Sequence, residues 1–229
     1  MASQFPGDRP PPITPPSYDG GPSSSGLVER VKNILTSPRT EWPRIDADPI
    51  SERGLYMGYV LPLAAIPAVA SVIGQLAFPP RIFGVVVRVS PVQAVITALV
   101  SYAMSILGVF IIARIVDALA PTFNGQKSVV SATKLVVFSS VAAWVAGIFN
   151  ILPMLGGLIV LLASLYGLYL LFVGLPVMMK SPSDKTVPYI AVTIVVAIVV
   201  MLVVGIITGI VAAALSSAFA PAVGTITVT

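Results

Sequence analysis

The longest stretch without charge is the feature that most limits how this chain can fold. Between Lys134 and Lys180 lie 45 consecutive residues with no Asp, Glu, Lys or Arg. A helix needs about 20 apolar residues to cross a bilayer, so this stretch is too long for one span and long enough for two. The sequence NILPMLGG within it supplies turn residues. The stretch therefore predicts two spans joined by a tight hairpin close to the membrane.

The rest of the chain is equally apolar. Of its 229 residues, 56% are hydrophobic and 10% are charged, whereas soluble domains carry about 25% charged residues. Five apolar blocks are each long enough to cross a bilayer. They cover residues 54–78, 91–120, 128–150, 153–179 and 187–216. The sequence predicts an all-α integral membrane protein, a bundle of five transmembrane helices preceded by an interfacial amphipathic helix.

The first 53 residues divide into a tail and a pre-membrane segment. Residues 1–26 are rich in Pro, Ser and Gly, which predicts a disordered cytoplasmic tail; a proline-rich ligand is the alternative. Residues 27–53 form the pre-membrane segment, with Trp42 expected at the headgroups. Its amphipathic helix lies on the membrane, docks a partner or packs on the bundle. The apolar stripe holds Leu27, Val31, Ile34 and Leu35; the opposite face holds Glu29, Arg30, Lys32 and Asn33.

The distribution of Lys and Arg predicts the orientation. Eleven of the 13 basic residues fall in the N-terminal region or near the loops between spans two and three and spans four and five. The other two, Arg81 and Arg88, fall between spans one and two. Because basic loops stay on the cytoplasmic side, the N-terminus is expected inside. Five spans then place the C-terminal tail, residues 217–229, outside.

The corner between spans four and five combines proline with charge. Pro176 interrupts the end of span four, and Lys180 follows where a cation meets the negative end of the helix dipole. Pro182 ends the helix, and Lys185 follows in the loop before span five. Turn formation accounts for these residues; a site for a partner is the alternative.

The same corner resembles the Yip (Ypt/Rab-interacting protein) family, and the bacterial members most closely. YGLYLLFVGLPVMMKSPSDK is similar to the family's tyrosine-rich fourth span, Gly-Leu-Pro turn and Lys-x-Pro-x-x-Lys. VKNILTSPRTEW resembles the segment before the first span. The resemblance implies five spans in a bacterial cytoplasmic (inner) membrane and a role in scaffolding or partner binding. The motif residues are Tyr166, Tyr169, Gly174, Pro176, Lys180, Pro182 and Lys185.

The residue types present argue against catalysis. The chain contains no Cys and no His, which removes thiol and imidazole chemistry and the usual zinc sites. We expect no enzyme activity, cofactor, metal or nucleic-acid partner. Arg114 and Asp117 lie three residues apart near the end of span two, so they share a helix face and can form an ion pair.

Small residues offer helix contacts. Gly205 and Gly209 form Gly-x-x-x-Gly in span five, a spacing that lets helices approach closely in lipid, within one chain or between two copies. Tyr166 and Tyr169 either bond across helices or fill the core. The expected function is a non-enzymatic scaffold or adaptor that contacts membrane lipid and a membrane or cytoplasmic protein. The alternative is a small channel or transporter.

Overall fold

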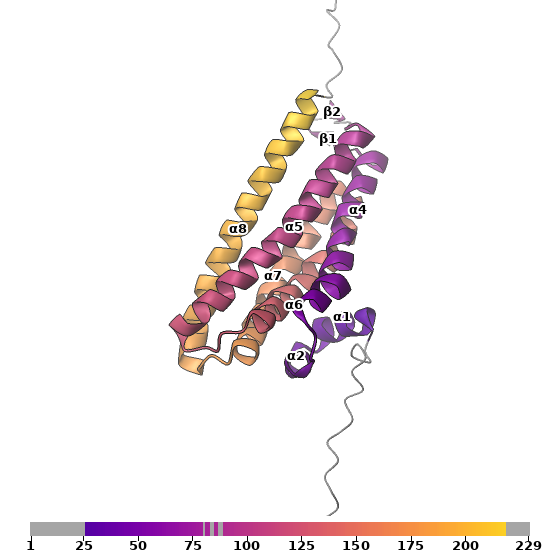
Figure 1. The fold of residues 1–229 in the computed structure, drawn as a ribbon. Helices are drawn as coiled ribbons and strands as arrows, with labels where there is room; N and C mark the ends of the chain where they lie inside the picture. The colour runs from indigo at the N-terminus through magenta and orange to yellow at the C-terminus, as the bar shows by residue number, and fades with distance from the viewer. Residues whose placement is uncertain (1–25, 80, 83–84, 87–88, 219–229) are drawn as a thin grey trace, which may run out of the picture.

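Five long helices form a bundle, and two short helices lie across one end of it (Figure 1). This computed structural model describes residues 26–79, 81–82, 85–86 and 89–218. The predicted N-terminal tail and most of the predicted C-terminal tail lie outside the described residues. The two short helices are α1 (Leu27–Thr36) and α2 (Pro38–Ala47). We call them together the cap.

The five long helices confirm the predicted number of spans, since each is long and apolar enough to cross a membrane. The first begins with α3 (Glu52–Leu55), continues through a π-helical turn, η1 (Tyr56–Val60), and ends with α4 (Leu61–Ala77). The others are α5 (Pro91–Leu119), α6 (Val129–Ala146), α7 (Pro153–Met179) and α8 (Ser183–Ala218). Short 3-10 helices, η2 (Ala120–Phe123) and η3 (Gly147–Ile151), follow α5 and α6.

Serines begin three of the spans as capping residues: Ser51 accepts a hydrogen bond from the Gly54 amide at 3.1 Å at the start of the first span. Ser90 accepts a hydrogen bond from the Gln93 amide at 3.1 Å, and Pro91 occupies the first helical position. Ser128 accepts from the Ser131 amide at 3.2 Å at the start of α6. The hairpin expected at NILPMLGG is formed by η3, which leads directly into α7.

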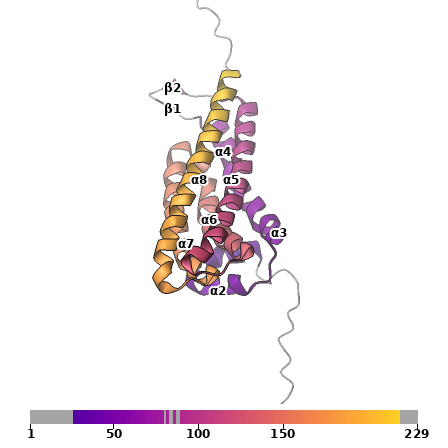
Figure 2. The same ribbon diagram turned by 60° about the vertical axis from the view of Figure 1, so that its left-hand side comes forward.

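The two ends of the bundle differ in composition. The basic end holds the cap, the loop from η2 to α6 and the corner between α7 and α8 (Figure 2). The opposite end, the hairpin end, holds η3 and two short antiparallel strands. These strands are β1 (Arg81–Ile82) and β2 (Val85–Val86), paired with Arg81 opposite Val86.

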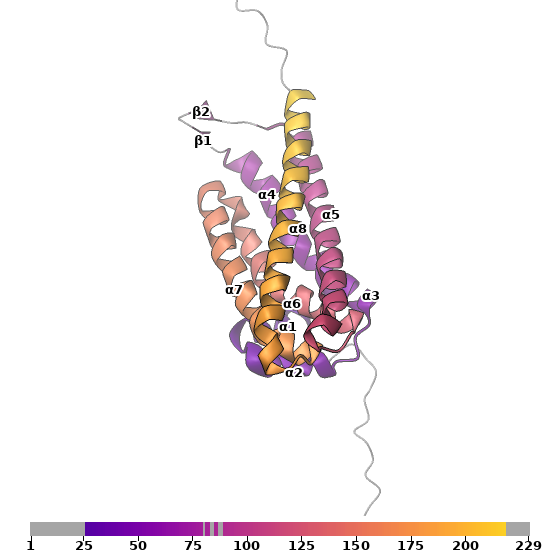
Figure 3. The same ribbon diagram turned by 90° about the vertical axis from the view of Figure 1, so that its left-hand side faces the viewer.

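The central helix of the bundle is α6. In the span that contains α6, 67% of the residues of the most apolar window are buried. In the span formed by α8, the buried share of that window is 11%. The closest partner of α6 is α7, whereas α8 packs mainly on α5 (Figure 3). The bundle therefore has α6 at its centre, and α8 is the most exposed of the four spans around it, whose windows are 11–28% buried.

Candidate functional site

The predicted corner lies at the basic end and is tied to two other segments. Lys180 ends α7 in the left-handed conformation, with φ 51°. Its ammonium group pairs with the Asp46 carboxylate at the end of α2. The preceding carbonyl, that of Met179, accepts a hydrogen bond from the Gln126 amide at 2.7 Å. Lys180 therefore lies at the end of α7, as expected, and also forms part of the contact between α7 and the cap.

The other corner residues shape the turn and leave the Lys185 charge on the surface. Pro176 lies inside α7, close to its end. The Pro182 carbonyl accepts hydrogen bonds from the amides of Lys185 and Thr186, each at 3.0 Å. The Lys185 side chain is exposed. Of the two corner lysines, Lys185 is therefore the one that an approaching partner can contact without breaking an ion pair that the structure contains.

The two tyrosines of the motif have different surroundings. The Tyr166 hydroxyl donates a hydrogen bond of 2.7 Å to the Leu35 carbonyl near the end of α1. Tyr169 stands 5.6 Å from Tyr166 between ring centroids and is 40% exposed. Tyr166 therefore bonds across helices, the alternative to filling the core, and fixes α1 on the bundle.

Gly174 provides the space that seats the cap on α7. A side chain at this position would collide with the six-membered ring of Trp42, so the indole lies directly on the glycine. Trp42 is fully buried and meets Phe138 of α6 edge-on, with 6.4 Å between ring centroids. The expectation that Trp42 lies among headgroups is wrong, because the groove over Gly174 buries the whole ring.

Arg30 points into the cap and not away from it, which corrects the predicted helix faces. Its guanidinium bonds Glu41 (Nη1 to Oε1, 2.8 Å) and Asp48 (Nη2 to Oδ2, 2.6 Å). Burial alone would lower the pKa of Arg30, but the hydrogen bond to Glu41 and its negative charge outweigh burial, and the pKa lies above its usual value. Arg30 is four residues from Ile34, so the two share a face. We call Arg30, Glu41 and Asp48 the cap triad.

Lys134 is a second buried cation that joins the cap to the bundle. It lies near the start of α6 and is 5% exposed. Its ammonium group donates to the carbonyls of Ile45, Asp46 and Asp48, at 2.8, 3.3 and 2.6 Å. These carbonyls end α2, where the negative pole of the helix dipole favours a cation. In the sequence, Lys134 indicates only the orientation of the chain. No local pattern marks its hydrogen-bond partners, because they lie 86 to 89 residues away.

Arg114 and Asp117 are not joined to each other in the described structure. Arg114 pairs with Glu52 at 2.8 Å and lies over the Phe110 ring, 4.7 Å from its centroid. The Arg114 pair therefore links the second span to the start of the first. Asp117 is buried, and its Oδ1 has no hydrogen-bond partner among the described residues.

Gly205 and Gly209 are exposed on α8, and Gly205 also lines a cavity between α8 and its neighbours. A Cβ added at either position meets no atom within 4 Å. The two glycines therefore make no close helix contact within the described chain, which was the first alternative for this Gly-x-x-x-Gly. Contact with a second copy, the other alternative, stays a prediction.

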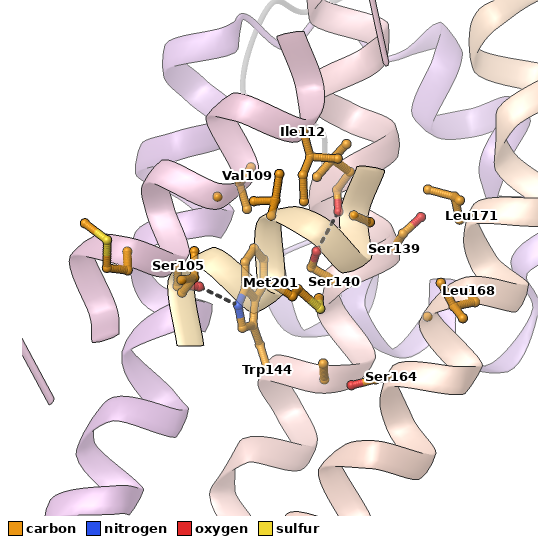
Figure 4. Close-up of a pocket in the computed structure, with 18 of the residues that line it drawn as sticks. Ser105, Val109, Ile112, Ser139, Ser140, Trp144, Ser164, Leu168, Leu171 and Met201 are labelled. Atoms are coloured by element: carbon orange, nitrogen blue, oxygen red, sulfur yellow. Dashed lines mark hydrogen bonds between the residues drawn. The ribbon is translucent and has the colours of Figure 1, made fainter. Parts of the chain in front are cut away.

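A cavity of about 340 Å³ lies between α5, α6, α7 and α8 (Figure 4). Apolar side chains make most of its wall, with hydroxyl groups from Ser105, Ser139, Ser140 and Ser164. Ser105 accepts a hydrogen bond from Trp144 Nε1 at 3.3 Å. Sequence reasoning did not find this cavity, because scattered serines in apolar helices carry no recognisable motif.

The groups gathered at these sites are suited to binding. The basic end has cations held by carboxylates and carbonyls, and the cavity has serines in a chain that contains no His to activate them. No group of three or more Asp or Glu residues suited to a metal occurs in the described part of the chain.

These features define an integral membrane protein that crosses the bilayer several times and carries a helical cap at one end of its bundle. The family model described as Yip1 domain matches residues 32–206, about three quarters of the chain. The chain belongs to the Yip1 domain family. It matches no curated protein and no solved structure.

Proposed function

We propose that this protein is a non-enzymatic scaffold or adaptor of a bacterial cytoplasmic membrane, and that its basic end binds a membrane or cytoplasmic protein. The observation that supports the proposal is the division of charge at that end. Arg30 and Lys134 face inward and hold the cap, whereas seven basic side chains face outward among the described residues. They are Lys32, Arg39, Arg44, Arg53, Lys127, Lys180 and Lys185.

The outward charge favours an acidic partner. Only Glu29 and Asp184 are exposed acidic residues in the described part of this end, so its surface is net positive. A fixed positive surface steers an acidic partner and selects against a basic one. Anionic headgroups are attracted by the same charges, which would keep the cap close to the bilayer.

A channel or transporter has less support from the arrangement. The ionisable groups of the spans lie near the basic end, and Arg114 and Lys134 are held by Glu52 and by carbonyls of the cap. The cavity deeper in the bundle has a mostly apolar wall with no charged side chain. Ion- and proton-coupled transport usually places ionisable groups along the path.

Affinity capture of a protein partner from native membranes tests the proposed adaptor function. Tagged wild-type protein should retain a stoichiometric protein partner after cross-linking. Lys185→Glu should weaken capture and leave thermal stability unchanged, because the Lys185 side chain is exposed. Lys180→Ala should loosen the cap as well, since Lys180 pairs with Asp46. Unchanged capture in the Lys180→Ala, Lys185→Ala double variant would sink partner binding at the corner. Solute flux in liposomes without any partner would support the transporter.

The orientation follows from the basic end. We propose that this end is cytoplasmic, with the N-terminus inside and the C-terminus outside, because basic loops are retained in the cytoplasm. A reporter that is active only outside the cytoplasm should work after Thr229 and fail within residues 182–186. Activity at both positions would contradict five spans.

A further inference from the structure

The cavity between α5, α6, α7 and α8 has the size and position of a ligand site. Its volume of about 340 Å³ falls in the range of known small-molecule sites, roughly 300–1,000 Å³. Ser105, Ser139 and Ser164 lie near the middle of three spans, which places the cavity at the depth of the hydrocarbon core. A molecule that enters must therefore come from the bilayer.

The wall of the cavity is suited to a hydrocarbon chain. Leu168 and Leu171 of α7 line it together with Val200 and Val204 of α8. Met201 also lines it and is 61% exposed, so the cavity reaches the outer surface of the bundle beside α8. That surface faces acyl chains in a spanning protein. Water is a poor occupant, because cavities with apolar walls stay dry and bind apolar molecules.

One polar group in the wall lacks a partner. The Ser140 hydroxyl donates to a carbonyl of its own helix at 2.8 Å, and Ser105 accepts from Trp144 (Figure 4). The Ser164 hydroxyl donates to the Val160 carbonyl, also at 2.8 Å. Ser139 is only 8% exposed, and its hydroxyl is buried. This hydroxyl has no hydrogen-bond partner among the described residues. A buried hydroxyl without a partner is costly, and rotation of the Ser139 side chain toward the cavity that it lines would let an oxygen on the occupant satisfy it.

We propose that this cavity binds a neutral lipid, an uncharged molecule whose hydrocarbon chain carries a hydroxyl, ester or ketone oxygen. The chain fills the space between α7 and α8, and the oxygen accepts the Ser139 hydrogen bond. A charged ligand does not fit, because no ionisable side chain lines the cavity to offset its desolvation. The site is separate from the basic end, so it does not depend on the proposed adaptor function.

Photolabelling in defined vesicles tests the site. The full-length protein is reconstituted in phosphatidylcholine with a small fraction of diacylglycerol that carries a photoreactive group on one chain. Labelled peptides are then quantified by mass spectrometry. We expect saturable labelling of peptides that line the cavity, with loss of the label when unlabelled diacylglycerol is added. A photoreactive phosphatidylcholine should label the outward face of α8 without saturation.

Two matched pairs of variants locate the ligand. Gly108→Leu fills the cavity, since a Cβ there already contacts Val200 and Val204 at 3.8 and 4.0 Å; Gly157→Leu adds the same atoms in open space. Saturable labelling should disappear in the first and persist in the second. Ser139→Ala should raise the half-saturating probe concentration roughly three- to tenfold, the effect of one neutral hydrogen bond. Ser164→Ala should leave it unchanged, because the Ser164 hydroxyl already bonds the Val160 carbonyl.

Circular dichroism and thermal unfolding check that each variant folds. Equal labelling of folded Gly108→Leu and Gly157→Leu would overturn binding in the cavity. Equal half-saturation of Ser139→Ala and wild type would overturn the neutral-lipid assignment. The serine pair removes single hydroxyls, so it decides the question even if Gly108→Leu fails to fold.

Discussion

The cap and the outer helix α8 differ in how they are held to the bundle. The cap is a layer of two ten-residue helices, yet it carries buried charges, a buried indole and a tyrosine hydrogen bond to α7. The 36-residue helix α8 would be about 54 Å long if straight, and only 11% of its most apolar window is buried. The short element therefore has the more specific contacts.

The difference follows from the solvent around each region. Apolar side chains on α8 face hydrocarbon, so burying them against another helix yields no hydrophobic gain, and close packing must supply the contact energy. The cap lies at the charged end of the bundle, where Ile34 and Trp42 join the apolar core of the bundle and ion pairs fix the direction of the cap helices. We infer that geometry at the basic end is specified by polar contacts, whereas the position of α8 is only loosely specified.

Loss of Arg30 should destabilise the cap relative to α8 more than any other change proposed here. Arg30→Met removes the cation shared by Glu41 and Asp48 and leaves Glu41 only its longer contact with Arg44, at 3.4 Å; breaking a buried pair typically costs about 3–5 kcal/mol. Amides of the cap should exchange much faster with deuterium in the variant, while those of α8 keep their wild-type rates. Arg39→Met, at an exposed position of α2, is the control. Equal cap protection in both variants would contradict the role of the cap triad.

Loss of Lys134 should have the second-largest effect on the stability of the cap. Lys134→Met removes the charged donor from three carbonyls at the end of α2, of which that of Ile45 keeps the Asp48 amide at 3.3 Å; hydrogen bonds from a charged group suggest a cost on the order of 3 kcal/mol. The end of α2 should open to exchange before α1 does, since Arg30 still holds the first helix. Lys127→Met removes an exposed charge from the neighbouring loop and should change nothing. Uniform opening of both cap helices would argue against this local role.

A methyl group at Gly174 should displace the indole of Trp42. Gly174→Ala places a Cβ against the ring, and overpacking of this kind costs about 1–3 kcal/mol. In a Trp144→Phe background, the fluorescence of Trp42 should shift to longer wavelength as the ring becomes hydrated. Gly157→Ala, in open space on the same helix, should leave the emission unchanged. Unchanged emission in Gly174→Ala would show that the groove is not needed.

Removal of the tyrosine hydroxyl should give the smallest effect. Tyr166→Phe loses one neutral hydrogen bond to the Leu35 carbonyl, worth about 1 kcal/mol. The free energy of opening of α1, measured by hydrogen exchange, should fall by that amount. Tyr169→Phe alters a partly exposed ring and serves as the control. If the two variants behave alike, the hydroxyl of Tyr166 does not fix α1.

The spans could be predicted from the sequence because the thickness of the bilayer fixes their length. The uncharged stretch from Lys134 to Lys180 required two helices and a turn, and η3 with α7 forms that turn. Ser90 and Ser128 also act where capping residues are expected. These features depend on neighbouring residues or on composition, so a single sequence contains them.

The contacts of the cap could not be predicted, because their partners are distant in the chain. Arg30 and Trp42 have residue types that normally face water or headgroups. They are buried because Asp48 and Gly174 reach them through the fold, from 18 residues away in the case of Asp48. Local periodicity carries no information about such partners, so Arg30 was assigned to the wrong face.

The distance between two spin labels tests the fixed cap most directly. The chain has no native cysteine, so Arg39→Cys on α2 and Lys127→Cys beside α6 can be labelled without further change. In lipid nanodiscs, double electron–electron resonance should give one narrow distance distribution, which broadens when Arg30→Met is added. A broad distribution in the otherwise wild-type protein, unchanged by Arg30→Met, would contradict a cap held in place by buried ion pairs.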